Sequence, residues 1–399
     1  MITDPLAIAA LIAGITALAF WLDHRFELMS KIGASLMVII LGAILSNTGL
    51  VPQESPVYRG IEGPVTSLAI VYLLLGVRLA DLRETGPAML GLFLLASTGT
   101  ALGALAGAAF FADSLGSDTW KLAGAFTGTY TGGSLNFAAV GRGLDLPAST
   151  FAAASAADAV TTALWMGFIL MSPIILGRWI GSPAPAATGA LATIAADPPS
   201  EPTETPPGSK RVGAESEHHP YWSPVPIALF DLVLLAAIGM AVLIAAGALA
   251  RWVGLFPEIL WLTTIALALG QWPAVRRVRG SSQIGNLGLH LFFGVIGIRS
   301  LLAAMVEIGP AVFLYTLVAV AIHGIFLFSL GRILRASVPM LAVVSQAAIG
   351  GPSTAMAVAV SRGWASLMLP GVAVGIFGYA LGNYAGFGIA YLVRAIVGG

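Results

Sequence analysis

Long apolar runs separated by short polar intervals dominate the chain. Each run has about 17–27 residues, the length at which a helix can cross roughly 30 Å of hydrocarbon. The pattern predicts an all-α polytopic membrane protein with twelve apolar segments in two groups of six. They lie near 5–22, 31–49, 63–79, 87–112, 119–142 and 148–176, and then near 225–250, 256–273, 284–301, 310–334, 338–361 and 366–394.

A polar interval at 181–224 separates the two groups. It is rich in Pro, Ala, Ser, Glu and Thr. A stretch of this kind buries too little apolar surface to offset the entropy lost on ordering. The sequence therefore predicts a flexible cytoplasmic linker between a first transmembrane repeat (1–180) and a second one (225–399).

Composition agrees with a membrane solvent. Hydrophobic residues make up 57% of the 399 positions and charged residues only 10%, against about 25% charged in soluble domains. The mean hydropathy is +0.91. A formal net charge of zero gives no basic footprint for nucleic acid, and the lack of cysteine excludes disulfides and thiolate metal sites. Because no basic segment precedes it, 5–22 is expected to be a retained helix and not a signal peptide.

The two halves resemble each other in sequence. Three short motifs recur in the same order at nearly constant spacing, which predicts an internal repeat. The pairs are 75–78 with 296–299 (offset 221), 86–88 with 309–311 (offset 223), and 131–136 with 349–354 (offset 218).

The basic residues favour one topology. If all twelve segments cross, the 19 Lys and Arg divide 11 to 8 between the two sides. If 119–142 and 338–361 bend at their Gly-Gly pairs and return, each half has five crossings, the halves are inverted, and the division is 13 to 6. The richer side is then expected to be cytoplasmic and both termini periplasmic. Helices that unwind but still cross remain the alternative, so the total is 10–12 transmembrane segments.

The Gly-Gly pairs predict a binding site. A break frees backbone groups at membrane depth, which is tolerated where they line a cavity, and glycine-interrupted segments at matching places are typical of secondary transporters. An isolated Ser or Thr usually bonds between helices, but a repeated cluster favours a site for a cation and a polar solute. Its predicted members are Thr127, Thr129, Tyr130, Thr131, Gly132, Gly133, Ser134 and Asn136, with Ser345, Gln346, Gly350, Gly351, Ser353 and Thr354.

Asp158 is the sharpest single candidate. A carboxylate within a membrane segment is costly and usually marks an ion or proton pathway. Thr161 and Thr162 lie on the same helical face, and Asn383 occupies a roughly corresponding place in the second half. Asp158 can be read as a Na⁺ ligand, a proton carrier or a structural acid. The candidate Na⁺ ligands are Asp158, Asn136, Thr354 and Asn383.

Other ionisable residues are weaker candidates. His323 is expected to be a packing histidine, whereas His290 and Asp231 are expected to lie at the interface near segment ends. Arg78 and Arg299 recur at matching positions, and each is expected to end a helix and reach toward the interface.

The strings at 128–140 and 350–355 resemble the membrane family called domain of unknown function 819, over nearly the whole chain outside the linker. That family is grouped with the cation/proton antiporter and bile-acid sodium symporter superfamily. The resemblance implies inverted repeats, a panel domain, a mobile core domain with two broken segments, an elevator mechanism and a homodimer. Antiporters of that superfamily carry paired Asp-Asp or Asn-Asp on one core helix, whereas position 157 is Ala.

These features predict a transporter in the bacterial inner membrane and not an enzyme. The expected activity is Na⁺- or H⁺-coupled symport of a small organic solute such as a carboxylate, amino acid or short peptide. A cation/proton antiporter is the first alternative. A passive channel or an intramembrane enzyme is the second, although the sequence holds no His-Glu-x-x-His or Gly-x-Ser-x-Gly motif. No cofactor is expected beyond the coupling ion, and lipid is the surrounding partner.

Overall fold

The described part of the chain is helical throughout. The computed structural model describes residues 1–26, 29–30, 33–180, 225–254 and 256–397, and no strand occurs among them. The predicted all-α class is therefore confirmed. The linker predicted at 181–224 lies outside the described residues, and the division into two repeats stays a prediction. Within these described ranges, six helical stretches are long and apolar enough to cross a membrane: Pro5–Arg25, Pro87–Gly132, Ala148–Gly177, Leu229–Val253, Leu302–Ile333 and Ala365–Ile396.

The first half follows the predicted segments closely. Asp4 caps the first helix, which begins at Pro5, and its side chain accepts a hydrogen bond from the Leu6 N–H (3.2 Å). This arrangement satisfies a free N–H at a helix start. The helices are α1 (Pro5–Arg25), α3 (Ala34–Asn47), α4 (Pro56–Gly60), the π-helical turn η1 (Ile61–Val65), α5 (Thr66–Leu75), η2 (Leu79–Asp81), α6 (Leu82–Thr85), α7 (Pro87–Leu115), η3 (Gly116–Asp118), α8 (Thr119–Gly132), α9 (Ser134–Gly143) and α10 (Ala148–Ile180).

The second half differs from the prediction at one boundary. A segment was expected to begin at Pro310, matching Pro87, but α15 begins at Leu302 and contains Pro310 in its interior. Proline ends a helix only where its missing N–H cannot be tolerated, so the motif alone does not fix a boundary. The helices are α11 (Leu229–Val253), α12 (Glu258–Gly270), α13 (Pro273–Arg276), α14 (Ser281–Arg299), α15 (Leu302–Ile333), α16 (Val338–Ile349), α17 (Gly351–Ser361) and α18 (Ala365–Val397).

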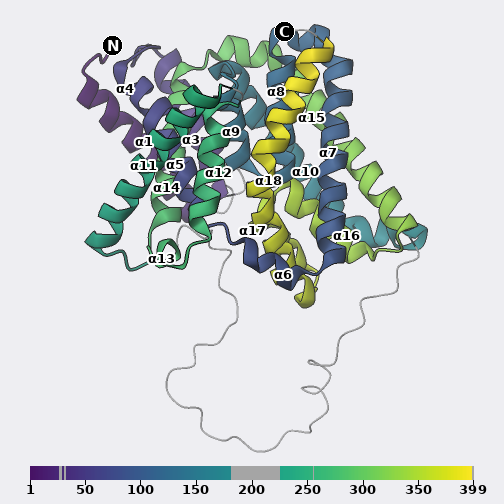
Figure 1. Cartoon of the computed structure of the whole chain (residues 1–399). Helices are drawn as coiled ribbons and strands as arrows, with labels where there is room; N and C mark the ends of the chain where they lie inside the picture. Colours follow the sequence, from purple (N-terminus) through teal and green to yellow (C-terminus); the bar gives the residue numbers. More distant parts are fainter. Residues whose placement is uncertain (27–28, 31–32, 181–224, 255, 398–399) are drawn as a thin grey trace, which may run out of the picture.

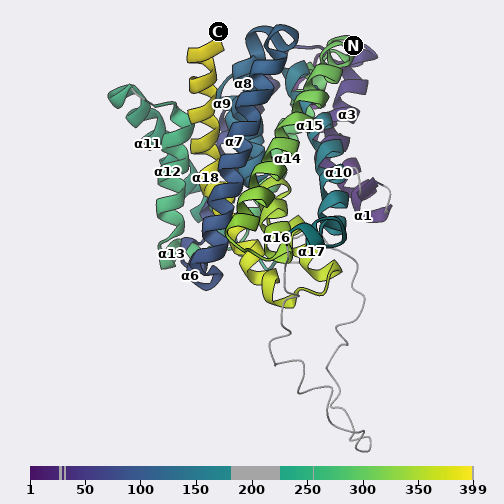
Figure 2. The same ribbon diagram turned by 90° about the vertical axis from the view of Figure 1, so that its right-hand side faces the viewer.

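The helices pack into two groups that lie side by side in Figure 1. The panel consists of α1, α3, α5, α11, α12 and α14, with α14 against α3 and α5, and α12 against α5. The core consists of α7, α8, α9, α10, α15, α16, α17 and α18, with α8 against α18 and α7 against α15. Figure 2 shows the core helices in front of the panel, whose two ends, α1–α3 and α11–α12, project on either side.

Two ends of the molecule can be distinguished, here called the upper and lower faces as drawn in Figure 1. The upper face holds the starts of α1, α10 and α15 and the end of α3, because Leu301 N–H bonds Ser149 Oγ (2.9 Å) and Leu302 N–H bonds Asn47 Oδ1 (3.2 Å). The lower face holds α6, α13 and α17. The end of α10 and the start of α11 also lie at the lower face.

Each half contains a helical hairpin that returns to the face from which it starts. Lys121 in the first turn of α8 bonds the Asp145 carbonyl oxygen just after α9 (2.9 Å), so α8 and α9 start and finish at the upper face. In the other half, α16 and α17 both pack against α18 near Gly371, and this hairpin opens to the lower face. The bends therefore lie inside the molecule.

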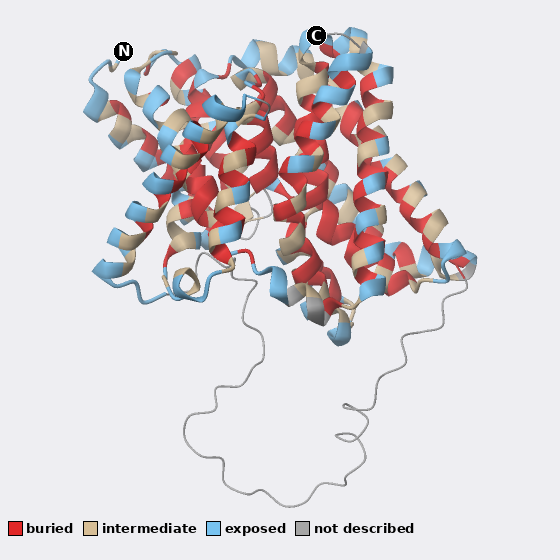
Figure 3. Ribbon diagram, viewed as in Figure 1, coloured by how far each residue is buried: buried red, intermediate tan, exposed pale blue. Residues whose placement is uncertain are grey.

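Burial divides the molecule as a lipid-facing protein requires. The interior of both hairpins is buried, as the red ribbon of Figure 3 shows. Large apolar side chains are instead exposed on the outer surface, among them Phe110, Ile174, Ile244 and Ile325. Such an extended apolar exterior suits a hydrocarbon surrounding and not water.

Candidate functional site at the crossing of two broken helices

The two helix breaks meet in the middle of the core. α8 ends at Gly132, and Gly133 adopts φ +88° before α9 begins. α16 ends at Ile349, and Gly351 adopts φ +83° at the start of α17. A Cβ placed on Gly133 would lie 3.8 Å from the Gly351 Cα. Both glycines have left-handed backbone that side chains rarely tolerate, and both breaks lie where the sequence predicts them.

A glycine-lined face of α18 lets the breaks approach so closely. A Cβ at Gly378 would collide with the Thr131 carbonyl oxygen, and a Cβ at Gly382 would lie 2.7 Å from the Asn136 amide. A Cβ at Gly375 would lie 2.8 Å from Pro352 in the other hairpin. Small residues spaced three or four apart permit this backbone contact between membrane helices. This spacing of glycines is visible in the sequence, although the face was not among the predicted site features.

Asn136 and Asn383 form the polar connection across this contact. The Asn136 Nδ2 donates to Asn383 Oδ1 (2.9 Å) and to the Tyr379 carbonyl oxygen (3.0 Å). The Asn383 Nδ2 in turn donates to Thr263 Oγ1 on α12 (2.9 Å). Amide groups thus join the first hairpin, α18 and the panel. Asn136 Oδ1 is buried and has no partner among the described residues.

Buried polar atoms without a described partner concentrate on the two broken helices. Native interiors pair nearly all such atoms with protein or ordered water, so an unpaired group of them marks a place for water, an ion or a solute. Trp261 Nε1 and Arg362 Nε lie outside this group. The six atoms on the broken helices belong to predicted site residues, and each residue is fully or almost fully buried. The atoms are Thr129 Oγ1, Tyr130 Oη, Thr131 Oγ1, Asn136 Oδ1, and Gln346 Oε1 and Nε2.

The remaining predicted residues of the hairpins surround this group unevenly. Thr127 Oγ1 is used within its own helix, bonding the Ala123 carbonyl (2.7 Å). Thr354 Oγ1 bonds the Gly351 carbonyl (3.1 Å), and a Cβ on Gly350 would collide with both the Thr354 hydroxyl and the Gln346 amide. Ser134 and Ser353 are exposed at the first turns of α9 and α17.

Asp158 lies on another side of α8. Thr162 Oγ1 donates to its Oδ1 (3.3 Å), and the Tyr130 hydroxyl faces the carboxylate without reaching hydrogen-bond geometry. Thr161 Oγ1 is paired instead with Thr316 on α15 (2.7 Å). Among the described residues, no hydrogen bond joins Asp158 to the other candidate Na⁺ ligands, Asn136, Asn383 and Thr354. The structure thus bonds the two asparagines to each other and bonds Asp158 to Thr162.

His323 is more central than the sequence indicated. Its Nδ1 lies 3.0 Å from the Ala96 carbonyl and its Nε2 lies 2.9 Å from Ser345 Oγ. A carbonyl only accepts, so Nδ1 must carry the proton and Nε2 must accept from Ser345. Trp165 Nε1 then donates to Ser345 Oγ (3.0 Å).

The same chain of bonds reaches the first hairpin. Thr100 Oγ1 lies 2.9 Å from His323 Nδ1 and donates to the Tyr130 carbonyl (2.9 Å). Every polar atom of the ring is satisfied, as expected for a packing histidine. Nevertheless, its bonds connect the last turn of α8 with α16, and no local sequence signal identified that role.

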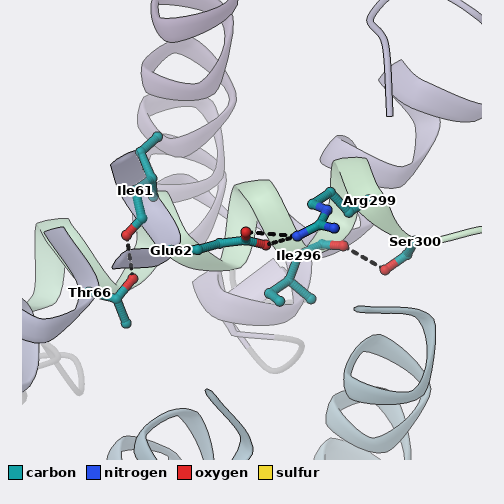
Figure 4. A network of polar contacts seen from close by, with 6 residues as sticks. All are labelled: Ile61, Glu62, Thr66, Ile296, Arg299 and Ser300. Atoms are coloured by element: carbon teal, nitrogen blue, oxygen red, sulfur yellow. Dashed lines mark hydrogen bonds and ion pairs between the residues drawn. The ribbon is translucent and has the colours of Figure 1, made fainter. Parts of the chain in front are cut away.

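A charged cleft opens beside the hairpin at the upper face. It has a volume of about 580 Å³ and lies between η1 and α5, the α9–α10 connection, the start of α12 and the end of α14. Figure 4 shows one wall, where Arg299 Nη1 donates to both Glu62 oxygens (2.8 and 2.7 Å). Arg299 ends α14 as predicted, but its partner is this carboxylate.

The π turn explains how Glu62 reaches the cleft. Pro64 has no N–H and interrupts the regular helix bonding, and Thr66 Oγ1 bonds the Ile61 carbonyl instead. Single π turns often occur at functional sites. Glu62, Arg142 and Glu258 of this cleft were not predicted from the sequence. Arg142, the last residue of the predicted apolar segment 119–142, was the available signal.

The structure revises one of two peripheral assignments. His290 was expected at the interface, but it is buried, and its ring nitrogens lie 3.2 Å from Ser35 Oγ and 2.7 Å from the Asn286 carbonyl. It lies where α14 packs against α3, which explains why a polar ring is tolerated there. Asp231 lies in the first turn of α11, where it accepts the Ala228 N–H (3.1 Å).

This architecture defines a multi-pass helical membrane protein with a polar site at the crossing of two broken helices. The chain belongs to the family described as "Protein of unknown function (DUF819)", whose profile matches residues 10–396. It is also 28% identical over 383 residues to the "Uncharacterized membrane protein YjcL" of Bacillus subtilis (strain 168), covering 93% of this chain and 92% of that protein. The expected family resemblance is therefore confirmed, whereas the wider superfamily grouping stays a prediction.

Proposed function

We propose that this protein is a cation-coupled secondary transporter of a small organic solute, with its site at the crossing of α8–α9 and α16–α17. One observation carries the proposal. Two broken helices contact each other at Gly133 and Gly351, and five of their buried side chains hold polar atoms without a described partner. Paired half-helix ends offer partial charges of both signs to an ion and a solute.

The arrangement of the two halves supports an inverted repeat. The first hairpin opens to the upper face and the second to the lower face, so each hairpin is the counterpart of the other with the membrane direction reversed. The packing is related in the same way. Helix α3 of the first half packs on α14 of the second half, and α12 of the second half packs on α5 of the first half. Transporters built this way alternate access between two related states.

The separation into panel and core supports an elevator movement. Polar connections between the two groups are few in the described part, and the cleft lies along the same boundary. In the proposed cycle the core carries both hairpins as one body against the panel. The hairpins stay in contact with α18 throughout, since its glycine face holds them together.

The coupling ion is assigned to Asp158. This carboxylate within α10 has Thr162 as a hydroxyl partner and faces Tyr130, an oxygen-rich surrounding that suits Na⁺. Ion binding there would act on the crossing through α8, which carries Tyr130. By reciprocal linkage, the ion and the solute then raise each other's affinity by the same factor.

The proposed location is the bacterial inner membrane, with the lower face in the cytoplasm. Basic side chains at α13 and at the end of α15 gather at that face, and an excess of Lys and Arg marks the cytoplasmic side. They are Arg276, Arg277, Arg279, Arg332 and Arg335.

The test is the thermal stability of the detergent-purified protein in NaCl, KCl and choline chloride. Saturation by an ion at 100 times its dissociation constant stabilises by about 2.7 kcal/mol. Of the three cations, we expect only Na⁺ to raise the melting temperature, and we expect Asp158→Asn to abolish this shift. Asp231→Asn, which changes an acid in the first turn of α11, is the matched control. Stability that follows pH through Asp158, with no response to Na⁺, would replace symport by cation/proton exchange.

A further inference from the structure

The charged cleft at the upper face carries chemistry that an ion site does not explain. Its lining holds three arginines and three acidic residues, so its charge is balanced and yet strongly polar. They are Arg59, Arg142 and Arg299, with Glu62, Asp145 and Glu258. Arg299 and Glu62 pair with each other. The other charged groups remain available to a solute.

Arg142 is the central cation of the cleft. It lies in the last turn of α9, the same half-helix that begins beside the crossing. Its Nη1 donates to Ser67 Oγ on α5 (2.7 Å), and no carboxylate of a described residue lies within ion-pair distance of it. A guanidinium presents five N–H donors in a fork that fits a carboxylate with two parallel bonds, so most of its donors remain unused.

Acidic groups lie around Arg142 but do not contact it. The carboxylates whose charge acts on it are, in decreasing order, Glu258, Asp145 and Glu62. No described residue bonds or ion-pairs with the carboxylate of Glu258 or Asp145. An anion on Arg142 would therefore lie close to two free negative charges. That surrounding disfavours a dianion and favours a solute that also carries a cationic group.

An apolar wall completes the cleft. Phe151 and Phe292 line it with their ring centroids 5.5 Å apart at 89°, and Ile259 and Leu262 lie beside them. The volume of about 580 Å³ is within the usual range for small-molecule sites. Leu262 precedes Thr263, which bonds Asn383, so this wall leads directly to the asparagine connection at the crossing.

We propose that the cleft binds a zwitterionic solute, an apolar amino acid or a short apolar peptide with free termini. The carboxylate binds the Arg142 guanidinium, the ammonium group lies against Glu258 and Asp145, and the apolar side chain packs on Phe151 and Phe292. This inference rests on the proposed transport function: the cleft is where the solute binds on its way to the crossing, and its side chains specify that solute. The residue that recognises the solute carboxylate, Arg142, then lies on α9 and moves with the core in the proposed cycle.

The experiment measures thermal stabilisation of the full-length purified protein by phenylalanine and by the dipeptide Ala-Phe in NaCl. Each compound is compared with its C-terminal amide and its N-acetyl form, which lack one charge each. We expect the free form of at least one compound to stabilise and both modified forms to bind about tenfold to a hundredfold more weakly. Comparison of phenylalanine with Ala-Phe shows whether the solute is a single amino acid or a short peptide.

Variants assign the charges. With Arg142→Gln, the free acid and its amide should bind alike, whereas discrimination against the N-acetyl form should persist. With Glu258→Gln, discrimination against the N-acetyl form should weaken. Arg142→Lys keeps the charge without the fork and should give an intermediate result. Arg277→Gln, at the lower face, should leave all affinities unchanged.

The outcomes separate this inference from the transport proposal. If Na⁺ stabilises the protein through Asp158 but no zwitterion binds, or Arg142→Gln leaves the acid-to-amide discrimination intact, the cleft assignment is wrong and cation coupling stands. If phenylalanine or Ala-Phe binds through Arg142 without any effect of Na⁺, the cleft assignment stands and cation coupling fails.

Discussion

Asn136 donates a hydrogen bond of 2.9 Å to Asn383, although 247 residues separate them in the chain. The bond links the start of the first half-helix α9 with the long helix α18, and Asn383 passes the connection on to Thr263 in the panel. One asparagine pair therefore couples the crossing to the helix on which both hairpins rest and to the stationary side of the proposed elevator.

Replacing Asn383 tests this connection. Asn383→Ala leaves the buried Asn136 amide with one partner fewer and removes the donor to Thr263, so the free energy of unfolding should fall by about 1–3 kcal/mol. Unfolding in mixed micelles measures the change. Asn286→Ala removes a comparable amide that bonds only within its own helix, to Ser282, and should cost less. Equal losses of unfolding free energy in the two variants would show that the Asn136–Asn383 pair stabilises the protein no more than a hydrogen bond within one helix.

The glycine face of α18 predicts a contrast between two positions on one helix. Gly382→Ala places a Cβ 2.7 Å from the Asn136 amide, whereas Gly388 has no heavy atom near its added Cβ. Overpacking of this kind costs about 1–3 kcal/mol, so Gly382→Ala should lower the melting temperature. Gly388→Ala should match the parent protein, and a large loss there would contradict the packing described above.

The hydrogen bonds of His323 predict its tautomer. Nitrogen-15 NMR of histidine-labelled protein should show the proton on Nδ1 and a bare Nε2, because the Ala96 carbonyl accepts from one side and Ser345 donates from the other. Ser345→Ala removes the donor to Nε2 and should move that nitrogen's resonance. His290, which contacts Ser35 and Asn286 in the panel, serves as the internal reference. A proton on Nε2 in the parent protein would show that the hydrogen bonds around His323 run in the opposite direction.

The elevator movement can be tested by cross-linking because the chain has no cysteine. Thr264 on α12 and Tyr384 on α18 are hydrogen-bonded across the panel–core boundary (2.8 Å). A short bifunctional thiol reagent joining cysteines at these two positions should stop sodium flux into proteoliposomes. Cysteines at Asp118 and Thr150 join two core elements that are similarly close (3.2 Å) and should leave flux intact. Unimpaired flux in the first pair would exclude relative movement there.

The pair of Glu62 and Arg299 should contribute little to stability despite its short distances. The two side chains are 21% and 39% exposed, and exposed ion pairs are worth about 1 kcal/mol or less. A double-mutant cycle with Glu62→Gln and Arg299→Gln should give a coupling energy in that range. A coupling of several kcal/mol would mean that the pair is shielded from solvent and holds the panel together.

Much of the fold was accessible from the sequence, for a simple physical reason. Hydrocarbon requires long apolar runs, and the left-handed backbone at Gly133 and Gly351 leaves a glycine in the sequence wherever a helix must break. Segment positions and break positions could therefore be predicted. The start of α15 could not, because Pro310 fits a helix interior as well as a helix start when packing compensates for it.

The candidate site was less accessible, since its members come from distant parts of the chain. Polar residues on the broken segments could be recognised by type and spacing. In contrast, helix packing decides which of these residues bond one another: Asn136 bonds Asn383, whereas Asp158 bonds Thr162. Arg142 and Glu258 were missed because each looked like an ordinary charge near a segment end, whereas the bend of the first hairpin brings them into one cleft.

The contact of the two helix bends has a consequence for permeability. Gly133 and Gly351 meet and Tyr379 lies against both, so each hairpin ends against the other inside the core. In the proposed transport cycle, a solute held there lies between a hairpin that opens to the upper face and one that opens to the lower face. The position of the core relative to the panel then decides which solution has access.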